Sequence, residues 1–355
     1  MKSKTLILIV LATAISASVV FLLVREQDST QEQQKLFPNL AADAVNIANQ
    51  MNELRLSQGE QTLRIQKDDN GIWRVVEKDD FPADVPKIRA LLRALTEAEK
   101  IEEMSSRSED FPKLGIADAD ALDGAGILLE MDTTDNRWQL IVGNFPAHLD
   151  QGQYIRLPVE NRSWLINRRL ELDMTVDEWL DKYIIHMPPE SLHRIVIEKH
   201  DDELVSTMTI VRRTKDGEFE IENLPADREI KSPYALQQIA AAVDYLQFKE
   251  VFPKDNSFLL PETHIDATFT TFDGFELNMQ SYQIDNESYA IFSAGYQADI
   301  ASQYDTSSET EAEIQSDNEY LSELYANWYY KLLSPTYSSL DIKLDDLTTS
   351  KQESQ

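Results

Sequence analysis

One series of sequence motifs occurs twice along this chain of 355 residues, and this repetition constrains the fold more than any other feature. The motif "FPAD" at 81–84 precedes an amphipathic run, and a near copy, "LPAD", precedes another run at 224–227. Strand-like segments lie before each motif and after each run, in the same order and about 145 residues apart, as Ile65 and Ile210 illustrate. A fixed period is typical of repeated structural units. We therefore interpret the chain as a tandem duplication of one α+β unit, with the two motifs as strand-to-helix joints.

The first repeat should contain antiparallel strands and one main helix. Two strands are expected near 62–67 and 72–77, joined by a turn at "DDNG". Apolar residues then recur at steps of three and four, which predicts an amphipathic helix; they are Val85, Ile88, Leu91, Leu92, Leu95 and Ala98. Four alternating runs predict a meander of strands at 126–131, 137–143, 153–158 and 163–167. Thr175 and Glu178 are placed as a capping box for a short final helix.

The second repeat follows the same order. Strands are expected near 193–199, 207–213, 218–222, 266–272, 275–281 and 288–293. A helix between them would place five apolar residues on one face: Leu236, Ile239, Ala240, Val243 and Leu246. The "FPK" at 252–254 matches an earlier "FPK" at 111–113.

An aromatic stripe near the C-terminus predicts a last helix. It consists of Tyr320, Leu321, Leu324, Tyr325, Trp328 and Leu332, with Pro335 beyond its end. Such a stripe usually packs into a core, and the alternative is a partner surface formed by Tyr325 and Trp328.

These patterns divide the chain into five segments. They are an N-terminal transmembrane anchor (1–25), a polar spacer (26–35), a first α+β repeat (36–185), a second α+β repeat (186–347) and a polar tail (348–355). Within the second repeat, residues 297–318 are acidic and poor in apolar side chains, so a long loop is expected there. The tail should be frayed.

The anchor is expected at residues 5–24, which are twenty residues without a charge. A helix of that length crosses the hydrocarbon core of a bilayer, about 30 Å thick. Lys2 and Lys4 precede the segment, which predicts a cytoplasmic N-terminus and a periplasmic ectodomain on a single-pass protein of the bacterial inner membrane. A signal peptide cleaved after Ala17 is the alternative, but the apolar run continues beyond that point.

Composition excludes several classes of partner and chemistry. The 63 acidic residues outnumber the 33 basic ones, and a net charge of −30 opposes binding to nucleic acid. Cysteine is absent from the sequence, so disulfides, thiol catalysis and zinc-thiolate sites are excluded.

Two aspartates at the repeated joints are candidate functional residues. Asp84 abuts its helix and should cap it by accepting hydrogen bonds from the first turn. Asp227 is in a different position, because the second helix should begin at Ser232 and Pro233. Neither repeat offers a base or electrophile at a matching position. A structural role for the two aspartates is therefore favoured over a role as paired catalytic carboxylates.

Two further groups are candidate metal ligands. The loop at 118–124 contains Asp118, Asp120 and Asp123, but the position that a calcium loop reserves for Glu holds Leu129. His186, His193 and His200 are seven residues apart, but Pro188 and Pro189 interrupt the helix that would align them. His148 and His264 have no partner at ligand spacing. We therefore expect neither a metal nor a cofactor.

Several motifs together resemble the DUF4340 family. They are the anchor, an "LFP" entry, "GIW" before "FPAD", "IRALLRAL", "LGI", "IVGN", "QYIRL" and the closing segment from "NWYYKLLSP" to "LDDL". The resemblance covers most of residues 36–347. It implies an extracytoplasmic accessory component associated with ABC transporters of the gliding-motility type. The family carries no established catalytic residues, so the resemblance transfers no site.

The expected function is therefore that of a non-catalytic accessory or scaffold for an ABC-type envelope transport system. Its partners would be the membrane, through residues 5–24, and the permease or related transporter subunits. The alternative is a module that binds a polysaccharide or peptide in a cleft between the repeats. An enzyme is the third possibility, and the sequence lacks a nucleotide-binding glycine loop, "GxSxG" and "HExxH".

Overall fold

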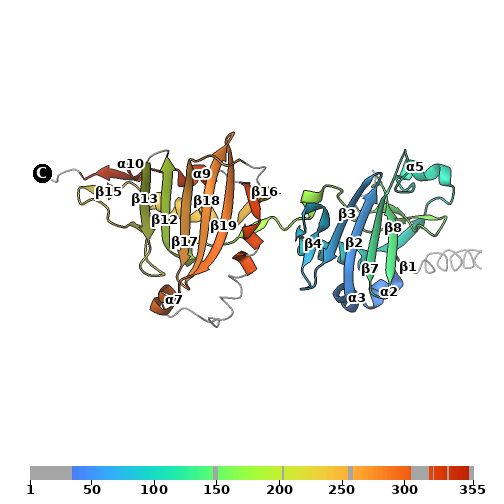
Figure 1. The fold of residues 1–355 in the computed structure, drawn as a ribbon. Helices are drawn as coiled ribbons and strands as arrows, with labels where there is room; N and C mark the ends of the chain where they lie inside the picture. The colour runs from blue at the N-terminus through green and yellow to red at the C-terminus, as the bar shows by residue number, and fades with distance from the viewer. Residues whose placement is uncertain are drawn as a thin grey trace, which may run out of the picture. The chain divides into compact units, whose positions relative to one another are not determined.

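The computed structural model describes residues 34–146, 151–201, 204–254, 259–304, 320–322, 324–333 and 336–351. Two compact units make up the chain, Met1–Asp181 and Lys182–Gln355, and each is a mixed α+β structure with a large antiparallel sheet (Figure 1). This confirms the α+β class. The predicted anchor at 5–24 and most of the predicted acidic loop lie outside the described residues. Among the helices that are described, none has the length and apolar character needed to cross a membrane.

Over its described residues, the first unit consists of one large antiparallel sheet and four helices, of which α4 is the longest. Its strands are β1 (Gln34–Lys35), β2 (Met51–Gln58), β3 (Gln61–Lys67), β4 (Trp73–Val75), β5 (Phe81–Pro82), β6 (Glu99–Glu103), β7 (Ile127–Thr133), β8 (Arg137–Val142), β9 (Gln153–Arg156) and β10 (Ser163–Ile166). Their order across the sheet is β1-β6-β10-β9-β8-β7-β2-β3-β4-β5. The helices are α2 (Pro38–Ala42), α3 (Ala44–Gln50), α4 (Val85–Glu97) and α5 (Phe111–Leu114), with 3-10 turns η1 (Val76–Lys78), η2 (Ser108–Asp110) and η3 (Val176–Trp179). Helix α4 is the predicted amphipathic helix and buries Ile88, Leu91 and Leu95.

The second unit contains a similar sheet and a small two-stranded one. The strands of the large sheet are β11 (Tyr183–Ile185), β12 (Leu192–Asp201), β13 (Leu204–Val211), β14 (Glu220–Ile221), β16 (Leu246–Pro253), β17 (His264–Thr271), β18 (Phe275–Ile284), β19 (Glu287–Tyr296) and β20 (Trp328–Leu332). Their order is β11-β16-β20-β19-β18-β17-β12-β13-β14, and β15 (Arg228–Ile230) pairs with β21 (Thr348–Ser350). The helices are α6 (Pro233–Ala240), α7 (Ala298–Tyr304), α9 (Thr336–Leu340) and α10 (Leu344–Leu347), with turns η4 (Pro189–Ser191) and η5 (Ala241–Val243).

The two large sheets share one strand order. The series β6-β10-β9-β8-β7-β2-β3-β4 of the first unit corresponds strand by strand to β16-β20-β19-β18-β17-β12-β13-β14 of the second. Ile65 pairs with a residue of β2 and a residue of β4, and Ile210 pairs in the same way with β12 and β14. A register shift also recurs, between Met51 and Glu53 in the β2–β7 ladder and between Leu192 and Arg194 in the β12–β17 ladder. The topology is therefore repeated down to the position of a β-bulge.

Strand β2 (Met51–Gln58) was not predicted from the sequence. Its apolar residues are few, and the register shift after Met51 breaks the alternation by which a strand is recognised. The equivalent segment of the second repeat, near 193–199, was expected as a strand and forms β12.

The predicted C-terminal helix is wrong over its second half. Residues Trp328–Leu332 form β20, which pairs with β16 and β19 inside the sheet. Tyr330 and Leu332 are buried, and Tyr330 packs against Phe248 and Phe292. Apolar side chains on both faces of a central strand mimic a helical stripe, because almost every position is apolar.

Three smaller expectations are also corrected. The second "FPK" is not equivalent to the first, because Phe252 and Pro253 are the last two residues of strand β16 whereas Phe111 begins helix α5. The tail is not frayed at Thr348–Ser350, which forms β21. The acidic segment is not a loop throughout, because its first residues form helix α7.

Candidate functional site

The candidate site lies on one face of the large sheet in the second unit. Helix α9 packs against β17, β18 and β19 on the opposite face, and Ile265, Ala267 and Phe269 of β17 are buried there. Because side chains of a strand alternate between faces, His264 and Asp266 point to the other side. We call that side the outer face. Figure 1 views this sheet with α9 behind it.

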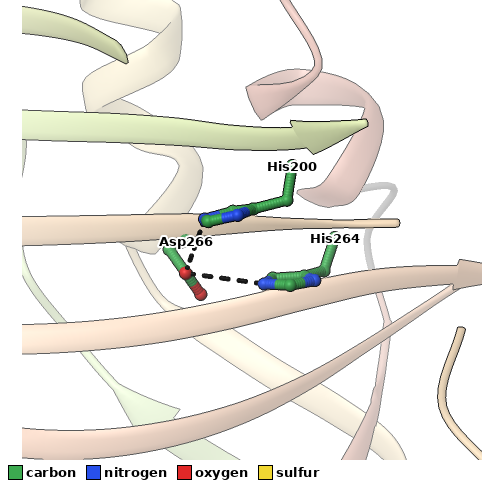
Figure 2. Close-up of side chains that lie close together, drawn as sticks. All are labelled: His200, His264 and Asp266. Carbon is green, nitrogen blue, oxygen red and sulfur yellow. Dashed lines mark ion pairs between the residues drawn. The ribbon is translucent and has the colours of Figure 1, made fainter. Parts of the chain in front are cut away.

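Two histidines and an aspartate meet on the outer face (Figure 2). His200 of β12 is the direct ladder partner of His264 of β17, and their rings stack with centroids 4.3 Å apart and planes 11° apart. The Nε2 atoms of His200 and His264 lie 3.1 Å and 3.6 Å from Oδ2 of Asp266. One ligand atom from each residue lies within 4.8 Å of the others. The three side chains are partly exposed.

The hydrogen bonds around the cluster fix the direction of one imidazole. His264 Nδ1 lies 2.6 Å from the backbone oxygen of Glu262. A carbonyl oxygen only accepts hydrogen bonds, so Nδ1 is the donor and carries a proton. In a neutral ring Nε2 then presents its lone pair toward Asp266. Metal-binding histidines are commonly held in this way, by donating the second ring N–H to a carbonyl.

His200 Nε2 is buried and unsatisfied. It makes no hydrogen bond within the described part of the chain, although it lies 3.1 Å from Asp266 Oδ2. The distance suits an ion pair, but the two groups are not aligned as donor and acceptor. A buried polar atom of this kind requires an explanation such as an unseen water or ion.

Tyr282 of β18 borders the cluster. Its ring lies beside that of His264, with centroids 5.6 Å apart. Burial of the hydroxyl, and to a smaller extent the negative charge of Asp266, raise the pKa of Tyr282 to about 12. The phenol therefore stays protonated at neutral pH.

A polar groove continues from the cluster along the outer face. It has a volume of about 320 Å³ and shares Asp266 with the cluster. The other lining residues are Lys254, Ala267, Thr268, Asn278, Met279, Gln280, Ile291, Phe292 and Ser293. A ligand in the groove would therefore lie next to the histidine cluster.

The cluster is specific to the second unit. The ladder pair Leu54 and Met131 of the first unit corresponds to the pair Ile195 and Phe269 of the second. Counting along the strands from these pairs places Gly59, Gly126 and Leu128 at the positions of His200, His264 and Asp266. None of these residues has a side chain that ligates a metal, so the repeated fold does not carry a repeated site.

We did not expect this cluster from the sequence, and the statement that His264 has no partner at ligand spacing is wrong. His264 and Asp266 are two residues apart on a strand, so they share a face. That spacing was a usable signal. The third member, His200, is brought in by the pairing of β12 with β17, which sequence spacing does not reveal.

Two further histidines, His186 and His193, lie elsewhere. His186 Nδ1 is 2.9 Å from Asp244 Oδ1, and its ring stacks on Tyr245. His193 Nδ1 lies 2.9 Å from the backbone oxygen of Arg212. His148 is outside the described residues.

The predicted cap at Asp84 is confirmed, whereas that at Thr175 is wrong. Asp84 accepts a hydrogen bond of 2.9 Å from the backbone N–H of Lys87 at the start of α4. Thr175 precedes the single turn η3, and its side chain makes no capping hydrogen bond. The backbone oxygen of Thr175 accepts from Glu178 instead, because a 3-10 turn is closed by that bond. Asp227 caps no helix, since α6 begins at Pro233 as expected.

The two residues considered as a partner surface belong to the core. Tyr325 is 1% exposed and donates a hydrogen bond of 2.7 Å to the backbone oxygen of Ile184. Trp328 is 8% exposed and lies on β20. A partner could not reach either side chain without opening this unit.

The acidic loop at 118–124 is held by an internal partner. Arg156, 6% exposed, donates from Nε to the backbone oxygen of Ile116 and from Nη2 to Asp118. Asp118, one of the three aspartates considered as calcium ligands, is therefore already paired.

Comparison with known proteins identifies the family. The family described as a domain of unknown function (DUF4340) matches residues 73–264, which is more than half of the chain. The matched range ends at His264, the first residue of β17. Comparisons with curated proteins and with solved structures found no match. On the family match, the chain belongs to the DUF4340 family.

Proposed function

We propose that this protein is a membrane-anchored, extracytoplasmic, non-catalytic accessory or scaffold component of an ABC-type envelope transport system. The apolar segment at 5–24 supports the anchor, its positive flank supports a periplasmic ectodomain, and the resemblance stated above supports the transporter. We infer further that the two units arose by tandem duplication. The shared strand order and the shared β-bulge support that origin.

The observation that carries the proposal is the large sheet with one helix-covered face and one polar face. In the second unit the outer face presents Thr268, Asn278 and Gln280 on adjacent strands, all partly exposed. Polar side chains on a rigid sheet suit recognition of a folded partner, because little side-chain ordering accompanies binding. An anchor would confine the search to the membrane and raise the effective concentration of the partner.

Crosslinking tests this proposal. The full-length protein is crosslinked in cells, extracted in mild detergent and purified, and the proteins that accompany it are identified. The matched control keeps residues 1–35 and lacks residues 36–355. We expect permease or ATPase subunits of an ABC transporter with the full chain and not with the control. Equal recovery from both would overturn the proposal.

The groove on the outer face favours a second candidate, a module that binds a polysaccharide or peptide. Its volume of about 320 Å³ is at the lower end of ligand sites. The groove lies within the second unit, not in the cleft between repeats that the sequence suggested. Replacing Asn278 by Arg would fill the groove, and Asn136→Arg, on the first unit, is the matched control. Loss of glycan or peptide binding in the first variant alone would support this candidate.

A further inference from the structure

We propose that His200, His264 and Asp266 form a binding site for a divalent first-row transition metal ion, with Zn²⁺ as the best-fitting occupant. The site is independent of the transporter proposal, because it rests only on side chains of the second unit. Two imidazoles and a carboxylate are a donor set that zinc, copper, nickel and iron share.

The distances between the donor atoms suit a tetrahedral ion. Bonds of about 2.0–2.1 Å to nitrogen and oxygen place the ligands of a tetrahedral zinc about 3.3 Å apart. Asp266 Oδ2 lies 3.1 Å from Nε2 of His200 and 3.6 Å from Nε2 of His264. The carboxylate and both imidazoles are therefore close to the required separation. All three donor atoms lie within 4.8 Å of one another. Binding one ion requires both imidazoles to turn out of their parallel stack, because the lone pair of each nitrogen lies in the plane of its ring.

The polarity of the cluster also suits a cation. His264 is oriented by Glu262 so that a neutral ring turns a lone pair toward the carboxylate of Asp266. His200 adds a second, buried Nε2 that no hydrogen bond satisfies within the described residues. Where the two nitrogens present lone pairs, positive charge between them and the carboxylate oxygen stabilises the cluster. A divalent ion supplies that charge and satisfies both nitrogens at once.

Three protein ligands leave a fourth position on zinc open. Such sites bind water or an external ligand at that position. Asp266 also lines the polar groove, so the open position is next to a space of about 320 Å³. A ligand or partner side chain in the groove would be able to complete the coordination.

Metal titration tests the site directly. The full-length protein is purified in mild detergent without a polyhistidine tag, stripped with EDTA and titrated with Zn²⁺ against a chromophoric chelator. We expect one tight equivalent per chain that neither Mg²⁺ nor Ca²⁺ displaces, because hard cations prefer oxygen ligands. H264A and D266N should each weaken binding at least tenfold. The matched control is H186Q, which removes an exposed histidine of the same unit that pairs with Asp244.

Equal Zn²⁺ affinity in H264A, D266N and H186Q would overturn the proposal. A second measurement needs no variant and covers the case in which a substitution disturbs folding. X-ray absorption of the zinc-loaded wild type should show a nitrogen and oxygen shell at about 2.0–2.1 Å with the outer-shell signal of imidazole. A purely oxygen shell would equally overturn the site.

Discussion

His200 and His264 are direct partners in the β12–β17 ladder, and their stacked rings lie on the outer face of the sheet. Their meeting depends on strand register, because a slip of one residue moves every side chain of a strand to the opposite face. The register of this ladder shifts once, between Leu192 and Arg194. The same shift occurs in the first unit, where Gly59 and Gly126 occupy the equivalent positions. The bulge is thus part of the shared fold, and the histidines are particular to the second unit.

Replacing Asp84 by Ala should destabilise the first unit by about 1 kcal/mol, because it removes the side-chain cap of α4. Urea unfolding followed by tryptophan fluorescence measures this unit, since four of the five tryptophans lie in it: Trp73, Trp138, Trp164 and Trp179. Asp227→Ala is the matched control at the other joint and should change the midpoint little. A loss of partner binding in Asp84→Ala at unchanged stability would contradict the capping role.

The patterns that predicted structure correctly were local ones. The helix α4 follows from a stripe repeated over four turns, and the strands β7 to β10 follow from alternation between short turns. In both cases the side chains that decide the structure lie within a few residues of one another. Asp84 was predictable for the same reason.

The features that escaped prediction depend on partners distant in sequence. Strand β20 pairs with β16 on one edge and β19 on the other and is buried on both faces, and its sequence alone fits a helix equally well. The histidine cluster needs the pairing of β12 with β17, which brings residues 200 and 264 together. Only its His264 and Asp266 component was visible locally.

The first unit should lose stability in acid partly through Asp110. Lys113, Ser105 and Arg107 each contact its carboxylate at 3.0 Å, and they hold the pKa of Asp110 at about 2, below the usual 3.8. A depressed pKa stabilises the fold above pH 3.8, and this contribution is lost as the pH falls toward 2.

Urea midpoints of wild type and Asp110→Asn check this at several pH values. The difference between the two should be largest above pH 3.8 and should shrink as the pH falls toward 2. Lys113→Met removes the hydrogen bond that lowers the pKa of Asp110 most. Its urea midpoint should therefore also differ from that of wild type, by less than the midpoint of Asp110→Asn does. A difference that is constant over this range would show that Asp110 does not contribute through its ionisation.

Arg156→Met should destabilise the first unit by about 2 kcal/mol, because the buried oxygen of Ile116 loses its donor. The loop at 118–124 would also lose the pairing of Asp118 with this guanidinium. The matched control is Arg162→Met, whose exposed partner Glu103 lies 3.6 Å away. An exposed pair of this kind contributes at most about 1 kcal/mol. Similar urea midpoints for the two variants would contradict the structural role of Arg156.

Tyr325→Phe should destabilise the second unit by about 1 kcal/mol, because the backbone oxygen of Ile184 loses a buried hydrogen bond while the ring stays in place. Hydrogen exchange followed by mass spectrometry measures this unit separately, and protection should fall in the peptides that contain β11 and β20. Tyr234→Phe removes a hydroxyl from a side chain that is 68% exposed and serves as the matched control. Tyr325 is a core residue on this account. If Tyr325→Phe left hydrogen-exchange protection unchanged but abolished partner binding, Tyr325 would instead belong to a recognition surface.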